Sequence, residues 1–264
     1  MTSADSDTPA STTDSAASAA SAASAGSEAL LVSAPAEPTA PSALVAPTAP
    51  AAFNAIPAWR SPAAWCVLFL VFIAAVSLDL WSKDWAFRTV APQPVVLVYE
   101  QVSGNPGYSL PWHPGVTAIA PDLLDFHLVL NHGAVFGIGQ GRGPLFIAFT
   151  VLAVCTALWV FGKHTSSRSH LSHIGLALVL AGGVGNMYDR VAVGAVRDFL
   201  HLFPHRELPW GLHWPGGSNE WFPWVFNIAD SELIAGMLIL MLAIHLNERR
   251  QAMAAAGAAA RVVK

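Results

Sequence analysis

The stretch LSHIGLALVLAGGVGNMYDRVAV, residues 171–193, decides the fold class of this chain. It is long enough to cross about 30 Å of hydrocarbon at about 1.5 Å per residue, yet its C-terminal end carries Asn186, Asp189 and Arg190. Ionisable groups inside a bilayer are costly, rare and usually functional. The stretch therefore predicts a membrane helix that brings polar residues to one membrane surface.

Three further apolar runs have a similar length: Ala63–Leu80, Pro144–Phe161 and about Phe222–Leu246. Only 11% of the residues are charged, against about 25% in a typical soluble domain, so the charges cannot cover a water-exposed surface. We expect an all-α membrane protein built as a bundle of four transmembrane helices. No block of basic residues suggests a nucleic-acid partner.

The flanking segments differ from the membrane part in composition. Residues 1–57 are mainly Ala, Ser, Thr and Pro, which bury too little apolar area to offset their ordering entropy, so we expect a disordered and dispensable tail. This tail also lacks the basic n-region of a signal peptide. Residues 58–247 are expected to form the membrane domain, and residues 248–264 a cytoplasmic C-terminal tail.

The distribution of positive charge predicts the orientation. Lys163 and Arg168 lie in the short loop between the second and third spans, and Arg60 flanks the first span. Four more charges follow the last span: Arg249, Arg250, Arg261 and Lys264. The positive-inside rule then places both termini in the cytoplasm. Seven tryptophans fall on the opposite side, as in an interfacial aromatic belt: Trp81, Trp85, Trp112, Trp210, Trp214, Trp221 and Trp224.

The first outer loop, about residues 84–143, is more than a linker. Val95–Tyr99 and Phe126–Leu130 are β-prone runs, and a series of glycines from Gly133 to Gly143 supplies bends. We predict a small extracytoplasmic β-subdomain over about residues 90–143.

Neither a disulfide nor a metal site is expected. Cys66 and Cys155 lie inside apolar runs, which favours small buried side chains. His201 and His205 are four residues apart, but they lack the Glu of the zinc-protease pattern, and Pro204 interrupts any helix there.

Polar residues gather at one depth on three spans: Asp79 and Lys83, Asn186 and Asp189, and Asn227 and Asp230. The two Asn-x-x-Asp pairs are spaced i, i+3, so each pair is expected to share one helix face. The run Gly182-Gly183-x-Gly185 is expected to let its helix approach a neighbour closely. Two aspartates held together in a poorly hydrated site share a proton, so one acts as base and the other as acid. The spacing alone leaves Asp189 and Asp198 as equal candidates.

Five sequence blocks stand at the ends of the spans or in the loops between them: Asp79-Leu-Trp-Ser-Lys83, Asn131-His-Gly-Ala-Val-Phe136, Gly185-Asn-Met-Tyr-Asp-Arg190, Val196-Arg-Asp-Phe199 and Phe226-Asn-Ile-Ala-Asp-Ser231. Together, over about residues 63–246, they resemble lipoprotein signal peptidase (signal peptidase II), the bacterial membrane aspartic protease. Three features depart from that family: Arg197 replaces an apolar residue, Val135 replaces an alanine, and an insert follows at about residues 201–221.

The resemblance implies a role for each matched residue. Asp198 and Asp230 would be the catalytic pair. The residues that line the site and hold the substrate backbone would be Asn131, Asn186, Arg190 and Asn227. Those that support its geometry would be Asp79, Lys83, Asp189 and Gly133. No metal or organic cofactor is implied.

The resemblance also implies a substrate and a location. The substrate would be a diacylglyceryl-modified prolipoprotein, cut just before its lipidated cysteine at the outer leaflet of the bacterial cytoplasmic (inner) membrane, among membrane lipids. Two other readings stay open. Intramembrane carboxylates also relay protons in transporters, although those sites usually lie near the midplane. A non-catalytic lipoprotein-binding scaffold would keep the site's shape without needing both carboxylates.

Overall fold

The computed structural model describes residues 56–103, 105, 107–119, 122–133 and 143–262. The chain divides into two units, Met1–Thr48 and Ala49–Lys264, and the described residues all belong to the second. The expected disordered tail therefore lies outside the described residues, except for Ile56 and Pro57. These two pair with the loop of residues 165–169, where Ser167 N donates to Ile56 O at 2.8 Å and Pro57 bridges Ser166.

Four helices are long and apolar enough to cross a membrane, as the sequence predicts: α1 (Pro62–Thr89), α3 (Gly143–His164), α4 (His170–Ala192) and α5 (Ile228–Val262). The start of α1 is well defined, because Pro62 fixes the first helical position and the Ser61 side chain accepts a hydrogen bond from Ala64 N. At the other end of the unit, α5 continues far past the apolar run. The expected C-terminal tail is helical through Val262, because its Ala-rich sequence favours a helix.

Helix α4 packs against the other three spans, and its glycines are what allow it to lie so close to α5. A side chain at Gly182 would collide with the carbonyl oxygen of Ala229 and with Leu233. Further along, Gly175 and Gly236 face each other across the same contact, where a Cβ on Gly175 would lie 3.0 Å from Gly236 O. The sequence-based expectation of a close glycine contact is thus confirmed.

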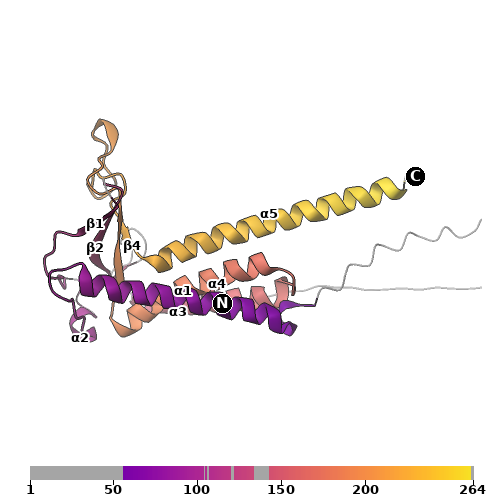
Figure 1. Cartoon of the computed structure of the whole chain (residues 1–264), viewed down its shortest axis with the longest axis horizontal. Coiled ribbons are helices and arrows are strands. Elements are labelled where there is room, and N and C mark those ends of the chain that lie inside the picture. Colours follow the sequence, from indigo (N-terminus) through magenta and orange to yellow (C-terminus); the bar gives the residue numbers. More distant parts are fainter. Residues whose placement is uncertain (1–55, 104, 106, 120–121, 134–142, 263–264) are drawn as a thin grey trace, which may run out of the picture. The chain divides into compact units, whose positions relative to one another are not determined.

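An antiparallel sheet lies across one end of the bundle (Figure 1). Its strands, in sheet order, are β1 (Val116–Ile119), β2 (Leu124–Asn131), β3 (Val196–Leu202) and β4 (Val225–Phe226). The Phe126–Leu130 run lies within β2, as predicted. Because β3 and β4 come from the loop between α4 and α5, the sheet is not confined to residues 90–143.

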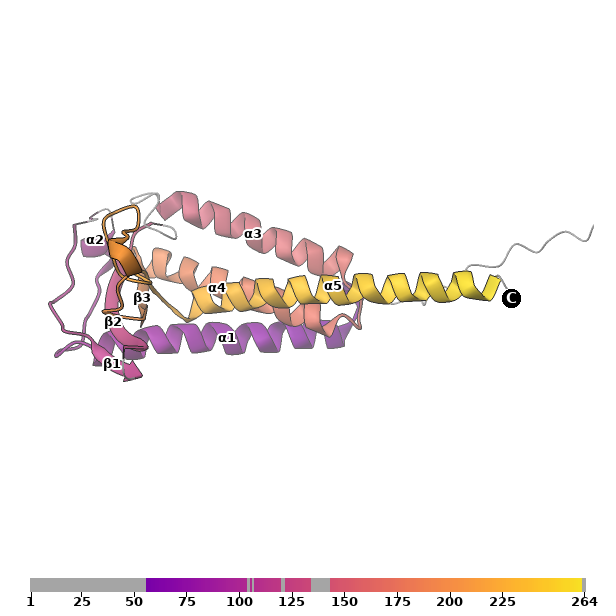
Figure 2. The same cartoon turned by 90° about the horizontal axis from the view of Figure 1, so that it is seen from above.

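The prediction of a strand at Val95–Tyr99 is wrong. Val95 N donates to Phe87 O at 2.8 Å, and the Val95 side chain is buried beside Phe87 and Val90 at the end of α1. The backbone therefore returns onto α1 instead of joining the sheet, and Tyr99–Val102 forms the short helix α2. The same apolar cluster contains Leu128 of β2 and Phe199 of β3, and it fastens the sheet to the bundle. Figure 2 shows β1 and β2 beside the end of α1.

The expected burial of the cysteines is also wrong. Cys66 on α1 and Cys155 on α3 are both free and both exposed on the protein surface. Each lies on an apolar helix that is long enough to span a membrane, so lipid rather than protein is the apolar surrounding that suits it.

Candidate active site

The first turn of α5 is held by a reciprocal cap. Asp230 N donates to Asn227 Oδ1 at 3.0 Å, and Asn227 N donates back to Asp230 Oδ2 at 3.2 Å. This is the geometry of a capping box, in which the residue before the helix and the third helical residue satisfy each other's backbone groups. The second Asn-x-x-Asp pair therefore does not share a helix face as expected, because Asn227 precedes α5. On α4, Asn186 and Asp189 do lie on the same face.

Helix α1 supplies a further cap for α5. Asp79 is fully buried, and its Oδ1 accepts a hydrogen bond from Ala229 N at 2.9 Å. A carboxylate is stabilised there because the N-terminus of a helix carries partial positive charge. The absence of a side chain at Gly185 makes the space for Asp79 Oδ2. Asp79 thus connects α1 to the first turn of α5.

Lys83 is the buried cation at the centre of the network. Its Nζ lies 2.8 Å from Asp79 Oδ2, 3.4 Å from Asp189 Oδ2 and 3.0 Å from Asn186 Oδ1. A lysine ammonium only donates hydrogen bonds, so it requires an oxygen from Asn186. Lys83 thereby fixes which end of the Asn186 amide faces it.

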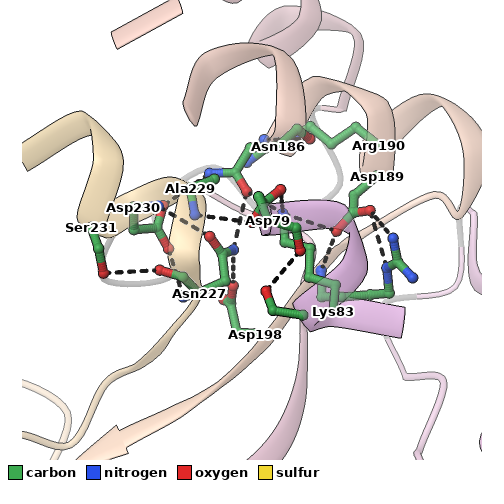
Figure 3. Close-up of polar contacts among 12 residues, drawn as sticks. Asp79, Lys83, Asn186, Asp189, Arg190, Asp198, Asn227, Ala229, Asp230 and Ser231 are labelled. Atoms are coloured by element: carbon green, nitrogen blue, oxygen red, sulfur yellow. Dashed lines mark hydrogen bonds and ion pairs between the residues drawn. The ribbon is translucent and has the colours of Figure 1, made fainter. Parts of the chain in front are cut away.

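The fixed amide of Asn186 sets the direction of the remaining bonds (Figure 3). Its Nδ2 must point the other way, where it donates to Asp230 Oδ1 at 2.9 Å. The Asn186 Oδ1 also accepts a hydrogen bond from Asn227 Nδ2 at 3.0 Å. Asn227 Nδ2 donates in addition to Asp198 Oδ1 at 2.6 Å. Two amides in series therefore join the carboxyl groups of Asp198 and Asp230.

The structure separates the two candidates that the spacing left equal. Both oxygens of Asp189 are occupied by Arg197, whose Nη2, Nε and backbone N lie 2.7, 3.0 and 2.9 Å away. Lys83 adds a further contact to Asp189. Asp189 is thus a fully buried, fully paired structural carboxylate, whereas Asp198 accepts hydrogen bonds from neutral amides. Sequence reasoning noted Arg197 as a departure from the family but missed its partner.

Asp198 lies on β3 with 1% of its surface exposed. Burial, and after it the charge of Asp230, raises the pKa of the Asp198 carboxyl to about 8, although hydrogen bonds from Asn131 and Asn227 and the charge of Lys83 oppose the shift. Asp230 is only partly buried. Its two carboxyl oxygens accept hydrogen bonds from Asn186 Nδ2 and Asn227 N. The raised pKa of Asp198 keeps a proton on that carboxyl at neutral pH.

Arg190 ties the loop after β2 to the site. Its Nη2 donates to Gly133 O at 2.9 Å and its Nη1 to Asn186 O at 3.2 Å, while the guanidinium lies 5.1 Å from the centre of the Phe146 ring. Gly133 N in turn donates to Asn131 Oδ1 at 3.0 Å. Residues 134–136 of the matched block, including Val135, lie outside the described residues.

All ten site residues named from the sequence therefore belong to one connected neighbourhood. One buried acid near it was overlooked: Glu232 is 7% exposed, and neither of its carboxyl oxygens has a hydrogen-bond partner within the described part of the chain. The sequence did offer a reason to consider Glu232, because it directly follows the block Phe226–Ser231 and lies one helical turn after Ala229. Within the same described residues, no group of three His, Cys, Asp or Glu side chains has metal-binding geometry.

The chain is similar to a known protein family and to several of its members. Residues 71–246 match the family model described as "Signal peptidase (SPase) II". A lipoprotein signal peptidase of Pseudomonas fluorescens is 35% identical over 152 residues, which cover 56% of this chain and 81% of that protein. One of Caulobacter vibrioides is 32% identical over 190 residues, 66% of this chain and 95% of that protein. A solved structure described as a bacterial membrane enzyme is 24% identical, with a TM-score of 0.49 over 69% of this chain and 88% of that chain.

Proposed function

Because the chain belongs to the signal peptidase II family, we propose that it works as an aspartic endopeptidase, with Asp198 and Asp230 as the catalytic pair. It is a multi-pass membrane protease that removes signal peptides from lipoproteins. The observation that carries the aspartic assignment is the amide bridge. Asn186 and Asn227 hold one oxygen of each carboxyl group and also hydrogen-bond each other.

The reaction follows from the unequal surroundings of the two carboxyls. Asp230 takes a proton from a water molecule as the water oxygen attacks the scissile carbonyl carbon, and Asp198 gives its proton to the carbonyl oxygen. The resulting gem-diol then collapses. Asp230 passes its proton to the amide nitrogen as the C–N bond breaks, and a hydroxyl proton returns to Asp198 as the carbonyl reforms.

Other residues of the site have supporting roles in this proposal. Asn131, Asn186, Arg190 and Asn227 line the site and orient the substrate backbone. The Arg190 guanidinium, held by Gly133 O and Asn186 O, is the fixed cation that we assign to a developing oxyanion. The buried group of Asp79, Lys83 and Asp189 keeps α1, α4 and α5 in register.

The proposed substrate is a prolipoprotein whose cysteine carries diacylglyceryl, cut just before that cysteine. We place the protein in the bacterial cytoplasmic (inner) membrane with both termini in the cytoplasm and the site at the outer leaflet. The charge distribution supports this, because Lys163 in the last turn of α3 and Arg168 in the α3–α4 loop lie at the opposite ends of those helices from the site. Arg249 and Arg250 lie on α5, far from its capped N-terminus.

The test is processing of a prolipoprotein in membranes by Asp198→Asn and Asp230→Asn. Removal of a general acid or base should slow cleavage at least about 100-fold, without loss of the folded protein. Asp84→Asn is the matched control, because Asp84 is an exposed carboxylate on α1 that pairs only with Arg88. Full cleavage by either dyad variant would refute the catalytic assignment.

Family membership favours the peptidase over the transporter and scaffold readings. The scaffold reading has its own signature in the same assay. A scaffold would bind prolipoprotein equally well with and without both aspartates, and the native protein would leave the substrate uncut.

A further inference from the structure

Residues 203–224, here called the arm, join the strand that carries Asp198 to the strand that leads into α5. The arm emerges at the end of the bundle that bears the sheet. From there the arm projects sideways beyond the helices (Figure 1). It occupies most of the insert that distinguishes this chain from the family pattern, and the proposed reaction does not use it.

Hydrogen bonds and an aromatic contact join the two sides of the arm. At its base Leu208 N donates to Asn219 O and Trp221 N to Arg206 O, both at 2.6 Å. Further out, the Trp214 indole donates to Glu220 O at 2.8 Å and its ring lies 4.8 Å from that of Trp224, edge to face. These contacts hold the two sides of the arm together, and within the outer part Leu212 N donates to Pro209 O at 3.3 Å.

The outer part of the arm carries no acidic or strongly basic residue, and His213 is its one titratable side chain. Residues 208–219 contain no Asp, Glu, Lys or Arg, whereas Arg206, Glu207 and Glu220 stand at the base. Trp210 is 91% exposed and Leu212 is 55% exposed. Trp210 also has φ of 59°, a left-handed conformation that is unusual for a bulky residue. An exposed tryptophan beside an exposed leucine calls for an apolar partner.

The lipid-facing surface of the bundle identifies that partner. The last turns of α1 and α4, at the end of the bundle that bears the sheet, expose Trp81, Tyr188 and Val191 on apolar helices. These residues mark where hydrocarbon gives way to headgroups, because aromatic side chains concentrate at that depth. In Figure 1 the arm leaves the bundle at the end that bears the sheet and runs across the direction of the helices, so its projection would lie along the membrane surface.

We propose that the arm is an interfacial membrane anchor that inserts Trp210 and Leu212 into the lipid leaflet at the end of the bundle that carries the site. The charged base stays in water and the uncharged tip lies among headgroups and upper acyl chains. Because the arm links the strand of Asp198 to the helix of Asp230, this contact fixes the height of the dyad relative to the leaflet. The insertion itself does not depend on the proposed reaction.

The experiment uses the full chain with Cys66→Ala and Cys155→Ala, two surface sites away from the network. An environment-sensitive fluorophore is attached to Trp210→Cys, to Leu212→Cys or, as the reference, to Glu100→Cys on the exposed surface of α2. Each protein is reconstituted in lipid nanodiscs with and without lipids that carry a nitroxide on the upper acyl chain. At positions 210 and 212 we expect blue-shifted emission and about twofold quenching or more, with little change at position 100.

Two results would overturn the anchor. Emission at positions 210 and 212 that is neither blue-shifted nor quenched by the nitroxide lipids would show that the tip stays in water. Quenching or a blue shift that appears only after addition of a lipopeptide substrate would make the tip a substrate contact instead. The label at position 212 keeps the test decisive if Trp210→Cys does not fold.

Discussion

Replacement of Lys83 by Met tests the claim that a buried cation organises the site. The methionine fills a similar volume but leaves Asp79 Oδ2 without its partner, while Asp189 keeps three hydrogen bonds from Arg197. One buried carboxylate is therefore left uncompensated, which costs about 3–5 kcal/mol of unfolding free energy. Cleavage should also fall, because the Asn186 amide that faces Asp230 then loses one of the two donors that orient its oxygen. Denaturant titration in mixed micelles measures the stability, and prolipoprotein cleavage measures the activity.

The same helix offers a matched control. Asp84 and Arg88 form a second i, i+4 ion pair on α1 at 3.0 Å, but their side chains are 50% and 68% exposed. Solvent screens such a pair, so Arg88→Ala should cost only about 0.3–0.5 kcal/mol. The two pairs differ chiefly in burial. If Lys83→Met and Arg88→Ala proved equally mild, the reasoning about the buried cation would be refuted.

Three other predictions concern pH, packing and the tail. The raised pKa of Asp198, about 8 against an ordinary 3.8, means that the folded state binds this proton more tightly than the unfolded state. Stability should therefore fall as pH rises from about 4 to about 8, and cleavage should fall above about pH 8; pH profiles check both, and Asp198→Asn should abolish the stability slope. Gly182→Ala should cost about 1–3 kcal/mol and displace the start of α5, whereas Gly183→Ala should be tolerated because its new Cβ would lie 3.5 Å from Thr150; melting and cleavage assays of both variants check this. Deletion of residues 2–55 should leave cleavage intact, and an inactive truncation would contradict the dispensable tail.

The four spans were predictable because hydrophobic length is a local property of the sequence. The strand error has a different origin: Val95–Tyr99 has the composition of a strand, but a strand also needs a partner. Val95 instead bonds back to Phe87, so tertiary contacts override local propensity. The β3 segment was missed for the converse reason, because its partner β2 lies some 70 residues earlier in the chain.

The site shows the same division. Spacing could place polar groups at one depth, but it could not choose between Asp189 and Asp198. That choice depends on Arg197 turning back onto Asp189 and on the amides that reach Asp198, which are contacts between separate elements. Sequence spacing likewise could not show that Asn227 precedes α5, since i, i+3 residues describe a helix face and a capping box equally well.

The capping box of α5 has a consequence for how the enzyme can move. Asp230 is at once a proposed proton acceptor and a fastening of its own helix to the preceding turn. A swing of this side chain toward a substrate would break its bonds from Asn227 N and Asn186 Nδ2, while Asp230 N and Ala229 N would keep their own acceptors. In the proposed reaction, adjustment during turnover would therefore fall first to the substrate and to the strand opposite, with this carboxylate as the stationary reference point.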